Sequence, residues 1–259
     1  MYRIDGRLDR ELRAISCDIG CYPTFDGSAL FSQGNTQVLA TVSGPKQCRI
    51  RNREKRDRAI IQVQIFFPAF CAVERKKSGR YDHHSKEVGL EIKNVLESLV
   101  LLEIQPRSQI DVNISVIQSD GGVKCASINA SVLALIDAGI PLKGVLAACA
   151  AGYVNDKPVL DMNRDEHTFK GADVPVALLT PISISKKGQS RSKTLDNAVE
   201  LLKESEDEIL LVESNAQLSA EQFNTVMALA MDGCKQIAEY MKQKVRAHGS
   251  KLLADIETV

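Results

Sequence analysis

The fold is organised around one stretch, Ser119-Asp-Gly-Gly-Val-Lys-Cys-Ala-Ser-Ile-Asn-Ala-Ser-Val-Leu-Ala-Leu-Ile-Asp-Ala-Gly-Ile-Pro141. Just before it, apolar residues alternate at period two between Ile110 and Val116, which predicts a strand. The glycine pair near its start allows the backbone angles of a tight turn. From Cys125 to Ala138 the residues are mostly small or aliphatic, so the sequence predicts a buried helix that a glycine and a proline end.

A glycine turn that leads into a helix offers free backbone N–H groups and the positive end of a helix dipole, which together can hold an anion such as phosphate. Gly121, Gly122, Val123 and Lys124 are therefore the candidate phosphate-binding residues. Glycine pairs are also common at plain turns, and the pattern by itself favours the plain turn.

Composition limits the function classes. The 259 residues can form one large domain or two joined halves, and 33 basic residues balance 33 acidic ones, so a nucleic-acid function must rest on local clusters. The chain shows no signal-peptide pattern and no run of about 18 apolar residues, so we expect an intracellular protein without a membrane span. Its seven cysteines lack C-x-x-C spacing, which predicts reduced, mainly buried thiols, and the four histidines give a metal site little support.

Three strands are predicted at residues 15–21, 29–32 and 37–42, as an antiparallel meander that Gly44-Pro45 ends. Residues 46–58 then form a loop rich in basic side chains. Clustered arginine on a loop suits RNA backbone contacts, but a solvated surface loop is equally consistent with the pattern. The candidate RNA-binding residues here are Arg49, Arg51, Arg53, Lys55, Arg56 and Arg58.

A strand at 59–67 leads to a second basic loop with Lys76, Lys77 and Arg80, followed by His83 and His84. Helical spacing of apolar residues predicts an amphipathic helix over 85–103. The two histidines precede this helix, and we interpret them as exposed or RNA-facing.

The second half begins with predicted strands at 144–154 and 158–161, a polar loop at 163–167 and a strand at 172–177. A hairpin begins at 182–184, and the charged residues 189–208 are interpreted as an insertion. A strand at 209–212 precedes a helix with a capping box at Ser219 and Gln222. The tail from His248 is expected to be partly ordered at most.

Several segments, in the right order along nearly the whole chain, resemble the RNase PH superfamily and, within it, the ring subunits of the RNA exosome. The matching segments are residues 3–7, 34–40, 74–76, 106–111, 120–141 and 172–176. The resemblance implies an α/β (α+β) fold of two pseudo-symmetric halves, each a mixed sheet with helices, at residues 1–142 and 143–259.

The resemblance also implies partners and a location. It implies a hetero-hexameric ring of related subunits around an RNA channel, with RNA-binding cap subunits, a separate catalytic nuclease and single-stranded RNA as further partners. It further implies roles in 3-prime RNA degradation and rRNA processing, in the nucleus, nucleolus and cytoplasm. The basic loop at 46–58 corresponds to the part of the family fold that faces the channel.

The same resemblance indicates an altered catalytic site. Active members hold phosphate with Ser or Thr followed by Arg, where this chain has Val123 and Lys124. They carry two carboxylates six residues apart, of which Asp173 remains while the other position is His167, and a paired arginine is replaced by His83-His84. We therefore expect a non-catalytic, RNA-conducting subunit without a cofactor. The alternative is a phosphorolytic exoribonuclease that uses inorganic phosphate. In it, Lys124 and the turn amides form the anion site, and Asp173, with or without His167, is the general acid.

Overall fold

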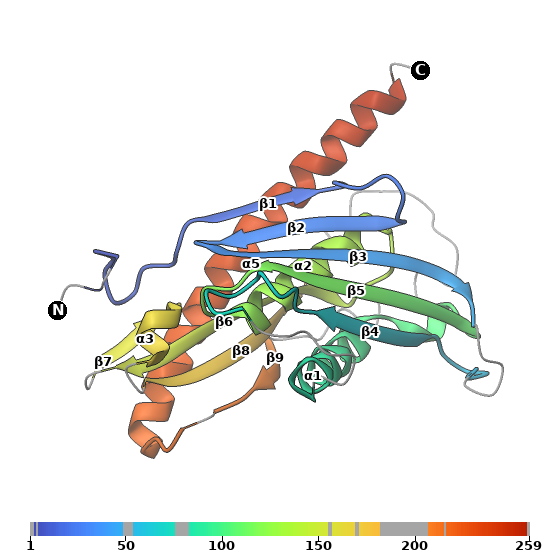
Figure 1. Cartoon of the computed structure of the whole chain (residues 1–259). Coiled ribbons are helices and arrows are strands. Elements are labelled where there is room, and N and C mark those ends of the chain that lie inside the picture. The colour runs from blue at the N-terminus through green and yellow to red at the C-terminus, as the bar shows by residue number, and fades with distance from the viewer. Residues whose placement is uncertain are drawn as a thin grey trace.

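The computed structural model describes residues 3, 5–48, 54–75, 83–154, 157–168, 171–181, 207–214 and 216–257. These residues form two sheets, with helices packed on and between them (Figure 1). The α/β architecture expected from the sequence is confirmed. Within the described ranges, no helix is both long and apolar enough to cross a membrane.

The first sheet has the strand order β1-β2-β3-β5-β4. Its strands are β1 Ile15–Ile19, β2 Gly27–Gln33, β3 Thr36–Gln47, β5 Ser108–Gln118 and β4 Ile60–Phe66. The first four pair antiparallel, whereas β4 runs parallel to β5 because a crossover through α1 (His83–Leu99) joins them. Helix α1 packs against β4, and α2 (Val123–Asp137) packs against β2 and β3.

The predicted meander is confirmed, but Gly44-Pro45 does not end it. Strand β3 continues to Gln47, and its pairing with β5 shifts register between Ser43 and Lys46. A bulge lets the strand pass a proline, which has no N–H to donate to the ladder.

Helix α2 is enclosed, as the sequence predicted, with every residue from Cys125 to Leu135 buried. The Asn129 side chain donates to the carbonyl of Ala148 at 2.9 Å and accepts from its N–H at 2.7 Å, so α2 is hydrogen-bonded to the second sheet. Gly139, at φ +68°, ends the helix with its N–H bonded to the Ile136 carbonyl.

The second sheet has the strand order β7-β6-β8-β9. Its strands are β7 Lys157–Leu160, β6 Gly144–Val154, β8 Ala172–Pro181 and β9 Glu208–Val212. All of their described pairings are antiparallel. Helix α5 (Ala220–Glu257) packs on β6 and β8 and extends past the β1 edge of the first sheet (Figure 1).

Three further element predictions were wrong. Residues 163–167 were expected as a loop, but Arg164–Thr168 form helix α3, because Glu166 accepts from the Asn163 N–H at 2.9 Å as in a capping box. Helix α1 begins at His83 and ends at Leu99, and a separate 3₁₀ turn, η2, follows at Leu102–Ile104.

The third wrong prediction concerns the tail. Helix α5 is continuous beyond His248, whose Nε2 lies 3.1 Å from Oδ1 of Asp137 at the end of α2. Its predicted capping box is confirmed by reciprocal bonds between Ser219 and Gln222 at 3.1 and 3.3 Å. The predicted hairpin at 182–184 and most of the insertion at 189–208 lie outside the described residues.

The cysteine prediction is confirmed. All seven cysteines lie in the described ranges and none forms a disulfide; the buried ones are Cys17, Cys71, Cys125, Cys149 and Cys234. Burial raises the pKa of the Cys17 thiol to about 11 and that of Cys234 to about 12, so these thiols are protonated at neutral pH.

Candidate functional site

The glycine turn joins β5 to α2 with two residues in the left-handed region, Gly121 at φ +83° and Gly122 at φ +64°. A Cβ at Gly121 would lie only 2.5 Å from the carbonyl oxygen of Met162. Both backbone angle and space therefore require glycine at this position.

A buried ion pair supports the turn from below. Arg13 donates to the carbonyls of Asp120 at 2.7 Å and Gly121 at 3.2 Å, and its guanidinium pairs with Asp161 at 2.7 Å. Thr36 Oγ1 donates to the same Gly121 carbonyl at 2.7 Å. Burial acts to raise the pKa of Asp161, but hydrogen bonds and charge from Arg13 outweigh it and leave that pKa below its ordinary value. The carbonyl groups of the turn are therefore hydrogen-bonded to an arginine that forms a charged pair with Asp161.

The first turn of α2 has no side-chain cap. Gly122 is the N-cap residue, its carbonyl accepts from the Ala126 N–H at 3.0 Å, and no side chain bonds to the helix start. The backbone part of the predicted anion site, glycine turn followed by helix N-terminus, is therefore formed by Gly121, Gly122 and Val123.

The side chain of Lys124 is already engaged by two carboxylates of the same chain. It pairs with Glu91 of α1 at 2.6 Å and with Glu213, just after β9. Burial acts to lower the pKa of Lys124, but its hydrogen bonds to the carboxylates of Glu213 and Glu91 outweigh this effect and raise that pKa. The lysine is therefore charged, and the protein itself neutralises its charge.

The structure brings the two candidate acid–base residues together. His167 Nε2, on α3, lies 3.5 Å from Oδ2 of Asp173, the second residue of β8. Burial raises the pKa of Asp173, and the charges of His167 and Lys124 offset this only in part. Asp173 Oδ1 is buried and has no hydrogen-bond partner among the described residues.

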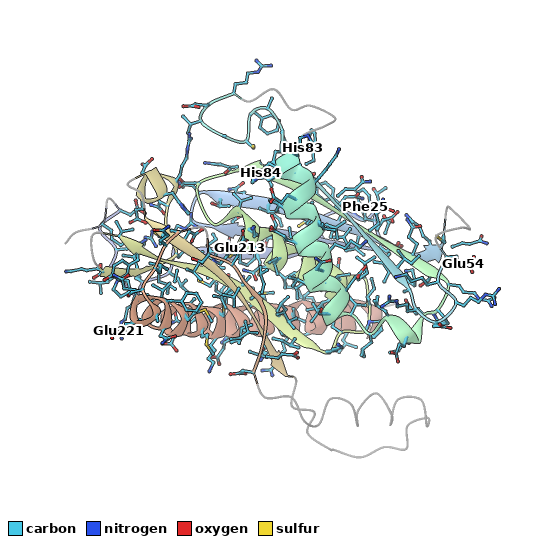
Figure 2. All side chains as sticks on the ribbon, turned by 90° about the horizontal axis from the view of Figure 1, so that it is seen from below. Phe25, Glu54, His83, His84, Glu213 and Glu221 are labelled. Atoms are coloured by element: carbon cyan, nitrogen blue, oxygen red, sulfur yellow. The ribbon has the colours of Figure 1, made fainter. Side chains whose placement is uncertain are left out.

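His83 and His84 are exposed, as expected, but they are the first two residues of α1 and do not precede it. The His84 ring packs against Phe67 with centroids 5.7 Å apart. Figure 2 shows both at the end of α1, with Glu213 beside the same helix.

The described part of the basic loop lies far from the glycine turn. Lys55, Arg56 and Arg58 are exposed and precede β4, whose Ile60 pairs with Gln109 at the start of β5. The 11 residues of β5 separate that end from the turn, which is about 35 Å at roughly 3.3 Å per residue. Figure 2 likewise shows Glu54 far from Glu213. Arg49, Arg51, Arg53, Lys76, Lys77 and Arg80 lie outside the described residues.

Sequence reasoning missed the partners of the site. Glu91 and Glu213 carry no motif, because their role depends on α1 and β9 meeting beside α2. Arg13 and Asp161 likewise meet only through the tertiary fold. Among the described residues, no group of three or more His, Cys, Asp or Glu side chains is placed to hold a metal ion.

Known proteins similar to this chain are named as exosome complex components. The chain is 36% identical over 251 residues to the exosome complex component RRP41 homolog of Arabidopsis thaliana, covering 96% of this chain and 94% of that protein. It is 35% identical over 258 residues to the human exosome complex component RRP41, covering 98% and 96%. It is 35% identical over 255 residues to exosome complex component Rrp41 of Thermococcus kodakarensis, covering 98% and 92%.

Solved structures share the fold. Rice Rrp46 superposes with a TM-score of 0.74 at 26% identity, covering 94% of this chain and 100% of that one. A chain of the Archaeoglobus fulgidus exosome with RNA bound to the active site superposes with a TM-score of 0.70 at 19% identity, covering 92% of each chain. The model of domain 1 of the 3' exoribonuclease family matches residues 11–141, and that of domain 2 matches residues 144–233. The chain therefore belongs to the 3' exoribonuclease, or RNase PH, family.

Proposed function

We propose that this chain is a ring subunit of an RNA exosome that conducts RNA and supports 3-prime-to-5-prime degradation and rRNA processing without carrying out phosphorolysis itself. Relatives named as exosome components align over nearly its whole length, which supports the assembly part of the proposal. The proposed partners are related ring subunits in a hetero-hexamer, RNA-binding cap subunits, a separate catalytic nuclease and single-stranded RNA. The proposed locations are the nucleus, nucleolus and cytoplasm, and the proposed halves are residues 1–142 and 143–259.

The observation that carries the non-catalytic part is the pairing of Lys124 with Glu91 and Glu213. An incoming phosphate would have to compete with two carboxylates already at the ammonium group, and like charges at such short range repel. Val123 adds no hydroxyl donor. The proposed function includes no cofactor.

The RNA contacts belong to the exposed basic residues in this proposal. Lys55, Arg56 and Arg58 are exposed, and they would bind RNA phosphates through charge without reading bases. We also assign RNA contact to Arg49, Arg51, Arg53, Lys76, Lys77, Arg80, His83 and His84.

The test is reconstitution with related ring subunits, followed by incubation with single-stranded RNA and inorganic phosphate. We expect a ring that binds RNA and releases no nucleoside diphosphates through this chain. Replacement of Lys55, Arg56 and Arg58 by Glu should weaken RNA binding and reduce its salt dependence, whereas Lys242→Glu on α5 serves as a control. Unchanged affinity and salt slope would remove the RNA assignment.

One observation favours the phosphorolytic alternative. Asp173 has a raised pKa beside His167, which is the property of a general acid. Release of nucleoside diphosphates by the assembled ring, and its loss on Asp173→Asn, would establish catalysis by this chain. Activity that survives Asp173→Asn would come from another subunit.

A further inference from the structure

A cleft of about 830 Å³ opens beside the glycine turn, on the side of the N-terminal segment. Its walls come from that segment, the β2–β3 turn, the loop after β4, the end of β5 and α3. Lys124, His167 and Asp173 do not line it, so it is separate from the candidate catalytic residues. Its volume lies in the range of specific binding pockets.

Three exposed apolar side chains line the cleft. Phe70 and Val73, in the loop after β4, are 76% and 89% exposed, and Ile117 at the end of β5 is 38% exposed. The loop is tied to β5 by a hydrogen bond of 2.8 Å from the Ser119 N–H to the Cys71 carbonyl. Large apolar side chains displayed on an anchored loop mark a protein-contact surface.

The arginines of the cleft are committed to partners in the chain. Arg7 pairs with Asp5 at 3.2 Å and donates to Asn163 Oδ1 at 3.1 Å, and its Nε is buried, without a hydrogen-bond partner among the described residues. Arg13 is paired with Asp161. Neither guanidinium is therefore a free docking point for a phosphate.

Two carboxylates of the cleft form no salt bridge among the described residues. The Asp120 side chain accepts from the neutral amide of Asn35 at 3.0 Å, and Asp165 is exposed. This charge balance repels RNA phosphates and attracts an ammonium or guanidinium group.

We infer that the cleft receives an extended polypeptide segment of a neighbouring subunit. In that segment a Lys or Arg side chain reaches Asp120 and Asp165, and an adjacent aliphatic or aromatic side chain packs on Phe70 and Val73. A small molecule fits less well, because Phe70 and Val73 are mostly exposed and a ligand held inside the cleft would leave part of their apolar surface uncovered. This inference rests on the proposed function, which supplies the neighbouring subunits.

Photocrosslinking within the assembled complex tests the occupant. Phe70 is replaced by the photoreactive residue p-benzoylphenylalanine, the complex is irradiated with and without single-stranded RNA, and the crosslinked peptide is identified by mass spectrometry. We expect a peptide of a different subunit with Lys or Arg within a few residues of the crosslinked position. A crosslink to RNA, to a second copy of this chain or to a segment without a basic residue would overturn the inference, as would the absence of a crosslink.

Matched variants test the energetics. Phe70→Ala and Asp165→Lys should each weaken retention of the crosslinked subunit at least tenfold in a dilution series followed by native mass spectrometry. Leu90→Ala and Asp232→Lys, which also alter exposed residues but lie outside the cleft, should have little effect. Equal retention in all four variants would refute the docking site.

The experiments distinguish a failure of the proposed function from a failure of the docking inference. If the unaltered chain does not assemble with related subunits, the proposed function fails and the docking inference fails with it. If the ring assembles and binds RNA but the Phe70 and Asp165 variants behave like their controls, only the docking inference fails.

Discussion

Lys124 carries the positive charge next to the glycine turn, and two carboxylates of the same chain neutralise it. Glu91 reaches it from α1 and Glu213 from the end of β9. Because both carboxylates lie against the ammonium group, their negative charges oppose the approach of an anion. The charge of Lys124 is therefore balanced within the chain.

Removing the two carboxylates should therefore restore anion binding. We expect the double variant Glu91→Gln with Glu213→Gln to bind inorganic phosphate at least tenfold more tightly than the unaltered chain, measured by calorimetry or ³¹P line broadening. Glu97→Gln, on the same helix but paired with Lys93, is the control. No gain in the double variant would show that the carboxylates are not what keeps phosphate away.

Asp173 is a second residue whose surroundings disfavour its charged form. Its pKa is raised by burial, and Oδ1 has no hydrogen-bond partner among the described residues. A carboxyl group whose pKa rises on folding stabilises the fold below its unfolded pKa, near 3.8, and this contribution is lost as pH rises through the folded value. Ionised Asp173 therefore costs stability at neutral pH.

We predict that Asp173→Asn raises the free energy of unfolding by about 1–2 kcal/mol at pH 7.5. The gain should shrink as pH falls through the raised pKa of the folded chain, because the carboxyl group of the unaltered chain is then protonated. Urea denaturation at pH 7.5 and at a series of lower pH values measures this. A variant that loses stability at pH 7.5 would mean that the attraction to His167 outweighs burial.

At the scale of elements, the turn between β5 and α2 decides where the helix begins. Gly121 combines a left-handed backbone angle with close contact to the Met162 carbonyl. Gly139, at the other end of α2, is also left-handed, at φ +68°, but a Cβ there would meet nothing within 4 Å. An added Cβ at Gly139 would therefore meet only an unfavourable backbone angle, whereas at Gly121 it would also clash with the Met162 carbonyl.

Gly139→Ala should lower the free energy of unfolding by about 1–2 kcal/mol, which is the cost of the left-handed region for alanine. Gly121→Ala should cost at least about 2 kcal/mol more, because the Cβ also displaces the chain around Met162. Thermal or urea unfolding of both variants provides the comparison. Equal losses would indicate that the Met162 segment moves away freely.

At the scale of the whole molecule, the N-terminal segment ties the two sheets together. Arg13, just before β1, pairs with Asp161 after β7, and Arg3 pairs with Glu166 of α3 at 2.7 Å. Both pairs are buried, so loss of one partner leaves an uncompensated charge. Burial alone would raise the pKa of both carboxyl groups, but the arginines outweigh it and lower each pKa below its ordinary value of 3.8 for Asp161 and 4.5 for Glu166.

Arg13→Met should lower the free energy of unfolding by about 3–5 kcal/mol at pH 7. Groups with lowered pKa values stabilise the fold above their unfolded pKa, and that stability is lost as pH falls through the folded value. The deficit of Arg13→Met should therefore shrink as pH falls below about 3.8. Arg10→Met, at an exposed position, is the control in urea titrations across pH, and a deficit that does not change with pH would contradict the assignment.

Local patterns in the sequence determined most elements and the family. Alternation between Ile110 and Val116, the glycine pair and the small residues of α2 act over a few neighbours, so they could be read directly. The capping box at Ser219 marked the start of α5 for the same reason. The end of α5 was missed because the bond between His248 and Asp137, which contributes to its docking, joins distant parts of the chain.

Only the tertiary structure decided which residues surround the glycine turn and Lys124. Lys124 and Glu213 are 89 positions apart in the chain, and they meet because β9 joins the second sheet beside α1 and α2. The cleft beside the turn likewise combines segments from both sheets. The sequence determined which charged groups are present. The order and packing of the strands decided which of these groups neutralise each other and which remain free to bind. The reason is that the energy between two charges depends on their distance in space and not on their separation along the chain.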